Sequence, residues 1–597
     1  PGLSQSLIAL CSPPPDPRPR NTVGEMNLKW AAGGRITGTY LEPGEKKMTL
    51  RPEELEQIPE ETIKVAKAAF PKGNAYLKLR DELKSIYTDE DFADLFPRRG
   101  QPAESPGRLA LITVLQFAEG LSDRQAADAV RGRIDWKYLL GLELSDPGFD
   151  YSVLSEFRSR LLQGGAEDRL LDKLVELMKA RKLVKERGQQ RTDSTHIEAA
   201  VRQLNRLEKV GETLRAALNS VANRAPEWLK LRAPVEWYER YGARVEAYRL
   251  PKTEQERERL AVQIGEDGYC LLGWAYESDS PQIVREDPGV EILRRIWIQE
   301  YYQEDDHTHW RKLDNMPPVK DSIYSPYDTE AVYGKKRTMD WVGYKAHYTE
   351  TCDDDMPHVI IQVKTTPAAT ADNEVVPAIH QSLADKHLLP TEHLMDSGYV
   401  DAGHVFAGEQ EYGVCTIGFA MPDTSWQAKA NQGFDLTHFV IDWEKKVVTC
   451  PAQHHSHWWN VVTTEHGEPV ISASFSSHDC QPCPSRLNCT RSEKGGRAVR
   501  FRPQDEFETL RKLRERNATK EFKKKYRKRA GVEGTLSQGV RRCDLRHARY
   551  VGEAKTHLQN LAIATAINLV RLSNWFFDFP RALTSTSSFL SLAVGAA

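Results

Sequence analysis

The sequence predicts an α/β protein of several domains, in which helices cover the faces of a mixed β-sheet. The chain has 597 residues, which at roughly 150 residues per domain corresponds to about three to five domains. Apolar residues make up 40% of the chain and charged residues 28%, a composition that is typical of globular proteins and argues against a fibrous or largely disordered chain. Strand-like and helical segments alternate between residues 189 and 419, which indicates a sheet with helices packed on its faces.

We expect the two ends of the chain to lie outside the folded domains. Patterned sequence begins at Met48, and the segment Cys11–Arg20 is rich in proline without the apolar stretch of a secretory signal. Residues 1–47 are therefore predicted to be a disordered extension, and residues 581–597 a tail. No run reaches the ~18 apolar residues of a membrane span, because Thr565 and Asn568 interrupt the best candidate. We therefore expect no membrane partner.

Residues 48–165 are predicted to form a helical N-terminal domain that binds DNA. An apolar helix ends at Gly120, and Ser122 is placed to cap the next helix, which carries Arg124 and Gln125 near its start. Two short helices joined by a glycine-containing turn have the outline of a helix-turn-helix motif, whose second helix reads DNA. An ordinary helical hairpin gives the same pattern, so this alternative stays open.

Residues 166–420 are predicted to hold most of the sheet. The segment 189–200 reads as a strand containing Asp193, and a helical insertion follows over 201–330, with helices to about Leu313 and breaks at three prolines. Two strand-like runs, 342–350 and 358–365, indicate an antiparallel hairpin. Asp372 is then predicted to cap a helix, 393–399 reads as a short strand ending in Asp396, and 413–419 reads as the next strand.

Residues 421–500 are predicted to form an inserted domain that carries four cysteines. The spacing is Cys450, then Cys480-Gln-Pro-Cys483, then Cys489. Four thiolates would supply a tetrahedral structural Zn²⁺ site, and one of the nearby residues His454, His455 and His457 would be an alternative ligand. Four reduced thiols without a metal remain the other interpretation, because one CxxC pair is a moderately specific signal.

The C-terminal part, residues 501–580, is strongly basic and is predicted to complete the core. Between Arg486 and Arg549 there are 21 Lys or Arg residues against eight Asp or Glu residues, a polarity that favours a polyanionic partner. Tyr526, Arg529 and Glu533 share one face if this segment is helical. A salt-bridged surface helix is the alternative, and two glycines at 531 and 534 weaken the helical prediction.

Asp193 and Asp396 are the candidate metal ligands of the sheet. Acids at strand ends project into the crevice where open α/β sheets bind ligands, and two or three converging carboxylates suit Mg²⁺ or Mn²⁺. Two such ions about 3.5–4 Å apart support displacement at a phosphodiester. Taken alone, each aspartate is more often a cap or turn residue. Lys335, Lys336 and Arg337, which precede the predicted hairpin, would contact phosphates. Trp341 and Tyr344 are expected to be core residues, with stacking on a flipped base as the alternative.

Several phrases of the sequence, in this order, resemble the DDE transposases of bacterial insertion sequences. These are TDSTHI (192–197), GYKAHYTET (343–351), MDSGYV (395–400) and YRKRAGVEGTLSQGVRR (526–542). The stretch from FADLFPRRGQ to YLLGLE (92–143) is similar to the N-terminal domain of the InsH-type subgroup. The resemblance covers roughly residues 48–580. It implies an RNase H-like catalytic core with long insertions that binds transposon ends and cuts and joins DNA with Mg²⁺ or Mn²⁺.

The resemblance assigns roles to individual residues. It implies that Asp193, Asp396 and Glu533 are the first, second and third metal-binding acids, with Glu553 as the second choice for the third. The family's Tyr-x-x-Arg-x-x-x-Glu signature is matched by Tyr526, Arg529 and Glu533, but Val540 stands where a basic residue follows, so Arg541 or Arg542 would take its place. The residues expected to contact DNA are Arg124, Gln125, Lys335, Lys336, Arg337, Tyr526, Arg529, Arg541 and Arg542.

The expected partners are the terminal inverted repeats of an insertion sequence and the target DNA. Pairing of two ends further implies a homodimer, and a bacterial transposase would be cytoplasmic and nucleoid-associated when bound to DNA. Two rival functions stay open. One is a metal-dependent nuclease that does not transfer strands, and the other is a catalytically inactive DNA-binding protein.

Overall fold

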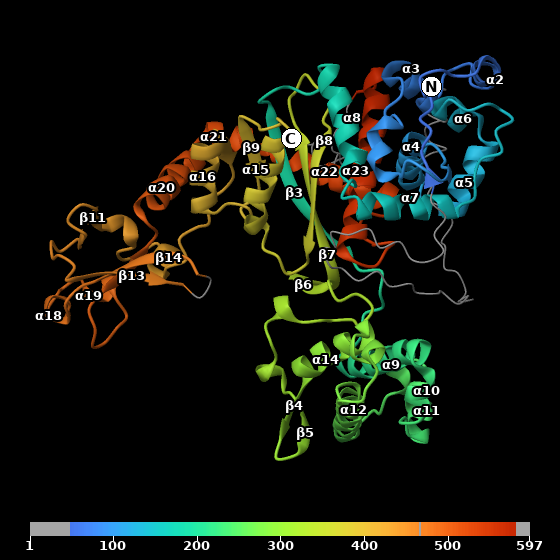
Figure 1. Cartoon of the computed structure of the whole chain (residues 1–597). Helices are drawn as coiled ribbons and strands as arrows, with labels where there is room; N and C mark the ends of the chain where they lie inside the picture. Colours follow the sequence, from blue (N-terminus) through green and yellow to red (C-terminus); the bar gives the residue numbers. More distant parts are fainter. Residues whose placement is uncertain (1–47, 465–466, 581–597) are drawn as a thin grey trace, which may run out of the picture.

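A computed structural model describes residues 48–464 and 467–580, and its centre is a six-stranded mixed sheet (Figure 1). The predicted extension 1–47 and tail 581–597 lie outside the described residues. The order is β10-β9-β3-β7-β6, and β8 also pairs with β7. Both β9 and β10 run parallel to β3, whereas β7 is antiparallel to β3. The strands are β3 (Gln189–Glu198), β6 (Val332–Lys336), β7 (Met339–Thr351), β8 (Ile360–Pro367), β9 (Glu392–Met395) and β10 (Cys415–Ile417).

The predicted hairpin at 342–350 and 358–365 is confirmed as β7 and β8, which pair antiparallel with an irregularity between Thr349 and Glu350. Strand β7 is longer than predicted, because its first five residues pair with β6 through a tight turn. Arg337 occupies that turn with a φ of 58°. This second hairpin escaped the sequence analysis, since Lys335 and Lys336 give β6 a polar end.

Helices cover both faces of the sheet. On one face lie α8 (Arg169–Ala180), α22 (Gly531–Cys543) and α23 (Glu553–Phe576), and on the other α15 (Val376–Asp385) and α16 (Ala402–Tyr412) (Figure 1). Helix α23 is apolar around most of its surface because it is buried between the sheet and the N-terminal helices. Among the described residues, no helix has the length and apolar character needed to cross a membrane.

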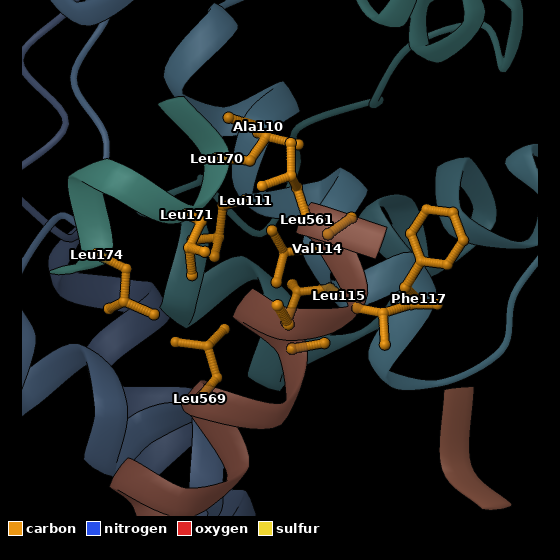
Figure 2. Close-up of a cluster of buried hydrophobic side chains, with 14 of the residues drawn as sticks. Ala110, Leu111, Val114, Leu115, Phe117, Leu170, Leu171, Leu174, Leu561 and Leu569 are labelled. Carbon is orange, nitrogen blue, oxygen red and sulfur yellow. The ribbon is translucent and has the colours of Figure 1, made fainter. Parts of the chain in front are cut away.

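The N-terminal helices share one hydrophobic core with the sheet. Side chains of α4, α8 and α23 interdigitate there, including Leu115, Leu171 and Leu561 (Figure 2). The region predicted as a separate DNA-binding domain is therefore packed directly on the core. Its elements are β1 (Met48–Thr49), α2 (Glu60–Ala69), α3 (Ala75–Leu83), η1 (Glu90–Leu95), β2 (Gln101–Pro102), α4 (Pro106–Ala118), α5 (Asp123–Gly132), α6 (Ile134–Leu140) and α7 (Ser152–Gln163).

The insertion between β3 and β6 has a hydrophobic core of its own. The three predicted breaks hold, since Pro226 begins α10, Pro234 caps α11, and Pro251 lies before α12. Its elements are α9 (Arg206–Arg224), α10 (Pro226–Lys230), α11 (Val235–Tyr241), η2 (Ala247–Arg249), α12 (Glu254–Ala275), α13 (Gln282–Arg285), α14 (Pro288–Glu300), β4 (Tyr301–Glu304), β5 (His307–Trp310), η3 (Leu313–Asn315) and η4 (Val319–Asp321).

The prediction that this insertion is helical to about Leu313 was wrong. Helix α14 ends at Glu300, and β4 pairs antiparallel with β5. Asp305 and Asp306 turn the chain with φ values of 50° and 60°, a left-handed conformation that aspartate tolerates better than most residues. The alternation of aromatic and polar residues around this acidic pair was the overlooked signal.

The second insertion forms a small body at the end of α20 (Figure 1). Its core includes Phe501, and Phe507 packs against it, so the body extends past the predicted boundary at residue 500. Its elements are α17 (Trp426–Ala430), η6 (Leu436–His438), β11 (Val440–Asp442), β12 (Val447–Thr449), β13 (Trp458–Thr463), β14 (Pro469–Ser474), α18 (Ser477–Cys480), α19 (Arg486–Cys489) and β15 (Ala498–Phe501). The chain returns to the sheet through α20 (Gln504–Ala518), α21 (Lys520–Tyr526) and η7 (Arg527–Ala530).

Candidate active site

The two predicted aspartates lie side by side on neighbouring parallel strands. Asp193 is in the middle of β3, and Asp396 directly follows β9. Thr192 pairs with Met395, so the next residue on each strand is one of the two acids. Asp193 is buried, with 6% of its surface exposed, and Asp396 is half-buried. The register of the sheet thus brings together two carboxylates that are far apart in the sequence.

The third predicted acid reaches the same place from a helix. Glu533 lies in the first turn of α22, which packs on β3. The guanidinium of Arg529 lies between the three carboxylates. Its Nη2 is 2.6 Å from Asp193 Oδ2 and 3.7 Å from Asp396 Oδ2, and its Nη1 is 3.0 Å from Glu533 Oε1. Three acids from three separate elements therefore converge on one positive charge.

Arg191 and Gly531 fix the position of α22 on the sheet. Arg191 stands two residues before Asp193 on the same face of β3, and its Nη1 donates to the backbone carbonyl of Lys528 at 2.6 Å. A Cβ at Gly531 would lie 2.0 Å from Arg191 Nη1, so a side chain at 531 would collide with the guanidinium. Gly531, which weakened the helical prediction, is thus needed for the close approach of helix and strand.

Glu350 is the buried carboxylate that completes this anchor. It has no exposed surface, and it accepts from Arg191 Nε at 2.7 Å, Arg571 Nη1 at 2.6 Å and the Thr535 hydroxyl at 2.6 Å. These two arginines hold the pKa of Glu350 below its ordinary value, although burial acts in the opposite direction. The network ties β3 and β7 to α22 and α23, and it thereby sets the height of Glu533 above the sheet.

The loop that carries Asp396 is held from the other face of the sheet. The Gly398 N–H donates to Asp396 Oδ1 at 2.8 Å. The Tyr399 hydroxyl lies 2.7 Å from His347 Nδ1, and both side chains are buried. Burial lowers the pKa of His347 to about 4, so the imidazole is neutral at pH 7. The neutral His347 and Tyr399 therefore support the loop that carries Asp396 from the opposite face of the sheet without adding charge.

The electrostatics of the site are dominated by burial of the first acid. The pKa of Asp193 is raised to about 6, because burial and, to a lesser degree, the charge of Asp396 outweigh the opposite effects of Arg529 and the Ser194 N–H. Lys336 also lowers the pKa of Asp193, which places this predicted phosphate contact in the electrostatic neighbourhood of the acids. Lys335 and Arg337 are exposed beside it at the β6–β7 turn.

The remaining predicted residues of the C-terminal part differ in their distance from the acids. Tyr526 lies near them, since burial raises its pKa and Arg529, Asp396, Asp193 and Glu533 all act on it, and its ring packs edge-on against Phe419, with ring centroids 4.6 Å apart. Arg541 is exposed in the last turn of α22, whereas Arg542 lines a cavity with Tyr76 and other residues of α3, α4 and α23. Of the two candidates for the missing basic residue, Arg541 is thus the better placed to contact DNA.

The alternative third acid is not part of this cluster. Glu553 begins α23, and its backbone N–H donates to Glu330 Oε2 at 2.7 Å. Burial raises the pKa of Glu553, and Glu330 raises it further. The geometry therefore favours Glu533 over Glu553 as the partner of the two aspartates.

The N-terminal candidates occupy a capped helix as predicted. Ser122 caps α5, and Gln125 accepts from the Ser122 N–H at 2.9 Å in a reciprocal capping box. Arg124 is exposed and lies over the ring of Tyr151 at 4.6 Å. The Gln125 side chain is thus engaged in the cap. The exposed Arg124 side chain is the one of the two that is more available for the predicted contact with DNA.

Sequence reasoning missed a second layer of polar residues around the site. Asp372 was predicted to cap a helix, but Ala371 occupies that position and Asp372 lies in the first turn of η5 (Asp372–Val375). Its carboxylate is 3.0 Å from Lys345 Nζ and 3.4 Å from Ser194 Oγ. Arg546 Nε similarly lies 3.4 Å from Thr195 Oγ1. No local pattern marks these contacts, since they join residues on separate elements.

The four predicted zinc ligands lie in the second insertion. Cys450, Cys480, Cys483 and Cys489 line one cavity, all four are half-buried, and none forms a disulfide. Burial raises the pKa of Cys489, and the other three thiols raise it further. Within residues 48–464 and 467–580, no group of three or more His, Cys, Asp or Glu side chains stands close enough together to hold a metal ion as the side chains are placed.

Two segments of the chain match known protein families. Residues 64–160 match a transposase domain, DUF772, and residues 449–573 match a transposase DDE domain. The first segment covers the N-terminal helices, and the second runs from the second insertion through Glu533 to α23. No curated protein and no solved structure matches the chain. These matches are consistent with a DDE-type insertion-sequence transposase, and they confirm the resemblance that the motifs indicated.

Proposed function

We propose that the protein is a transposase that binds the ends of an insertion sequence and catalyses metal-dependent DNA cleavage and strand transfer. The observation that supports it best is the convergence of Asp193, Asp396 and Glu533 on one cation, the Arg529 guanidinium. The matches to two transposase domains support DNA as the substrate. A homodimer on two paired ends is part of the proposal.

The sheet topology supports an RNase H-like core. A central strand, β3, is flanked by antiparallel β7 and then β8 on one side, and by parallel β9 and β10 on the other. In this arrangement the first acid stands on the central strand and the second at the end of its parallel neighbour. The third acid comes from a helix that packs on the same strand.

The residues of the site fit a hard divalent cation. The three side chains offer oxygen atoms, which Mg²⁺ and Mn²⁺ prefer. They already surround one positive charge, because the Arg529 guanidinium stands where a metal would be held. When bound there, such ions would activate the attacking water or 3′-hydroxyl and stabilise the leaving oxygen.

The protein's own residues would then act on the DNA. Arg529 would leave the carboxylates and contact a backbone phosphate, since a guanidinium pairs with phosphate as readily as with carboxylate. Lys335, Lys336 and Arg337 would hold the same strand at the β6–β7 turn, where they are exposed. Contacts of this kind position DNA and do not read its sequence.

The proposal is tested with Asp193→Ala, Asp396→Ala and Glu533→Ala, each assayed on DNA that flanks the coding sequence. Each change should reduce strand cleavage in Mg²⁺ to background while leaving binding of the ends largely intact, because it removes an oxygen donor and no DNA-contacting cation. Glu553→Gln serves as a matched control and should cleave normally. Full cleavage by any of the three variants would contradict the assignment of that acid.

The rival functions can be distinguished by testing two DNA substrates, the uncut ends and a pre-cut end with a free 3′-hydroxyl. A nuclease without strand transfer would cut the ends but would not join a pre-cut 3′-hydroxyl end to target DNA. An inactive DNA-binding protein would neither nick nor join in the presence of Mg²⁺ or Mn²⁺. Joining of the pre-cut end supports the transposase.

A further inference from the structure

Four thiols gather in the second insertion from separate turns of the chain. Cys450 follows β12, Cys480 ends α18, Cys483 lies in the next turn, and Cys489 ends α19. All four line the same cavity together with His454, and none is joined in a disulfide. Four reduced cysteines lining one cavity supply the ligand types of a structural zinc site.

Two buried guanidinium nitrogens at this cavity have no acceptor among the described residues. Arg486 and Arg497 line it, and Arg486 Nη1 and Arg497 Nε are the two atoms that are buried without a hydrogen-bond partner there. Burying such a donor unpaired costs about 1–3 kcal/mol, and more for a charged group. Four metal-bound thiolates would carry two net negative charges and would accept from both arginines.

One contact of that kind is already present. The backbone N–H of Arg497 donates to Cys480 Sγ at 3.4 Å. Hydrogen bonds of this type orient metal ligands and stabilise their charge. A neutral thiol is a weak acceptor, so the donors around this cavity are better suited to thiolates than to thiols.

The second insertion has few other stabilising features. Its core contains seven buried hydrophobic residues, none of its described strands is longer than six residues, and α18 and α19 have four residues each. Small bodies with so few buried apolar side chains are commonly reinforced by a metal or disulfides, and zinc binding free energy is then folding free energy.

We propose that Cys450, Cys480, Cys483 and Cys489 bind one structural Zn²⁺ ion that stabilises the second insertion. Binding deprotonates the four thiols and releases their protons to solvent, with no change of oxidation state. Binding would draw the thiols closer together, because as they stand they are not close enough to hold an ion. This site is independent of the carboxylate site and of the proposed reaction.

The experiment measures metal content of the full chain by mass spectrometry. The wild-type protein should carry one zinc per chain, and replacement by Co²⁺ should give the thiolate-to-metal absorption of a tetrahedral site. Cys480→Ser and Cys483→Ser should lose the metal, whereas Cys270→Ser should retain it, because Cys270 is exposed on α12 in the first insertion. Asp193→Ala should also retain it, which separates this test from the one for catalysis.

A second measurement does not depend on the folding of any variant. Thiols of the wild-type chain are titrated with a chromogenic disulfide before and after removal of zinc by a chelator. Removal should expose four additional reactive thiols and reduce the protease resistance of the second insertion. A chain free of zinc after growth in zinc-supplemented medium, or an unchanged thiol count, would overturn the proposal.

Discussion

Arg529 has the most consequential position of any single residue near the acids. Three carboxylates close together repel one another, and each raises the cost of ionising the next. The guanidinium offsets this repulsion in the DNA-free protein, as its ion pairs with Asp193, Asp396 and Glu533 show. If the acids bind a cation as proposed, the same contacts make Arg529 its competitor, and metal affinity and DNA contact would then be coupled through one side chain.

The coupling predicts an unusual effect of Arg529→Gln. Removal of the competing charge should raise the affinity of the DNA-free protein for Mn²⁺ at least several-fold, as measured by isothermal titration calorimetry, while weakening its binding to DNA ends. Arg541→Gln is the matched control for the Mn²⁺ measurement, because Arg541 is exposed at the opposite end of α22 from Glu533. It is not a control for DNA binding, since Arg541 is itself an expected DNA contact. Equal or weaker Mn²⁺ binding by Arg529→Gln would show that the arginine does not compete with the metal.

At the scale of elements, the contact between β3 and α22 decides where the third acid lies. Arg191 passes beneath the start of α22 and reaches Glu350, and Gly531 leaves the room for it. Gly531 and Gly534 both weaken the sequence-based prediction of this helix, yet their surroundings differ. A Cβ at Gly534 would meet no neighbouring described atom within 4 Å, whereas a Cβ at Gly531 would have three atoms of Arg191 within 2.5 Å.

The difference between the two glycines gives a matched pair of variants. Gly531→Ala should destabilise the protein by about 1–3 kcal/mol, because the methyl group forces Arg191 or the helix to move, and it should impair cleavage by displacing Glu533. Gly534→Ala should be neutral or stabilising by about 0.5–1 kcal/mol, because alanine favours the helix. Both are read by chemical unfolding and by the cleavage assay. Equal stabilities of the two variants would argue against this packing.

For the whole molecule, the shared core is the main architectural fact. The N-terminal helices were predicted as a domain, but their apolar faces pack on α8 and α23, which also cover the sheet (Figure 2). The two insertions, in contrast, have separate cores. The N-terminal helices and the sheet should therefore behave as one folding unit, with the insertions attached to it.

The shared core predicts that a destabilising substitution in the N-terminal helices also destabilises the sheet. Leu115→Ala, at a fully buried position of α4, should cost about 2–5 kcal/mol by leaving a cavity. Hydrogen exchange should then accelerate in α4 and in β8 together, while the first insertion, which has its own core, should be unaffected. Faster exchange confined to the N-terminal helices would indicate that they unfold as an independent domain.

Much of the candidate site was predictable because its motifs are local. Asp193 within a strand, Asp396 at a strand end and the Tyr526–Arg529–Glu533 spacing are patterns of a few residues, and the resemblance of these patterns to transposase motifs predicted the three acids that the structure brings together. Asp372, Lys345 and Arg546 were not predictable, since their contacts join separate elements. The choice between Glu533 and Glu553 also needed the structure, because both begin helices and only their neighbours differ.

Local patterns in the chain were enough to predict many of its elements: the strands of the sheet other than β6, the Ser122 cap, the proline breaks of the first insertion, and the order of motifs that indicates a transposase. Each of these depends on side-chain periodicity or backbone preference over a short segment. Other contacts became known from the folded molecule alone, including the position of Arg529 between the three acids, the arginine beneath Gly531 and the common core of the N-terminal helices and the sheet. Those contacts depend on strand register and helix packing across hundreds of residues, and no local preference encodes them.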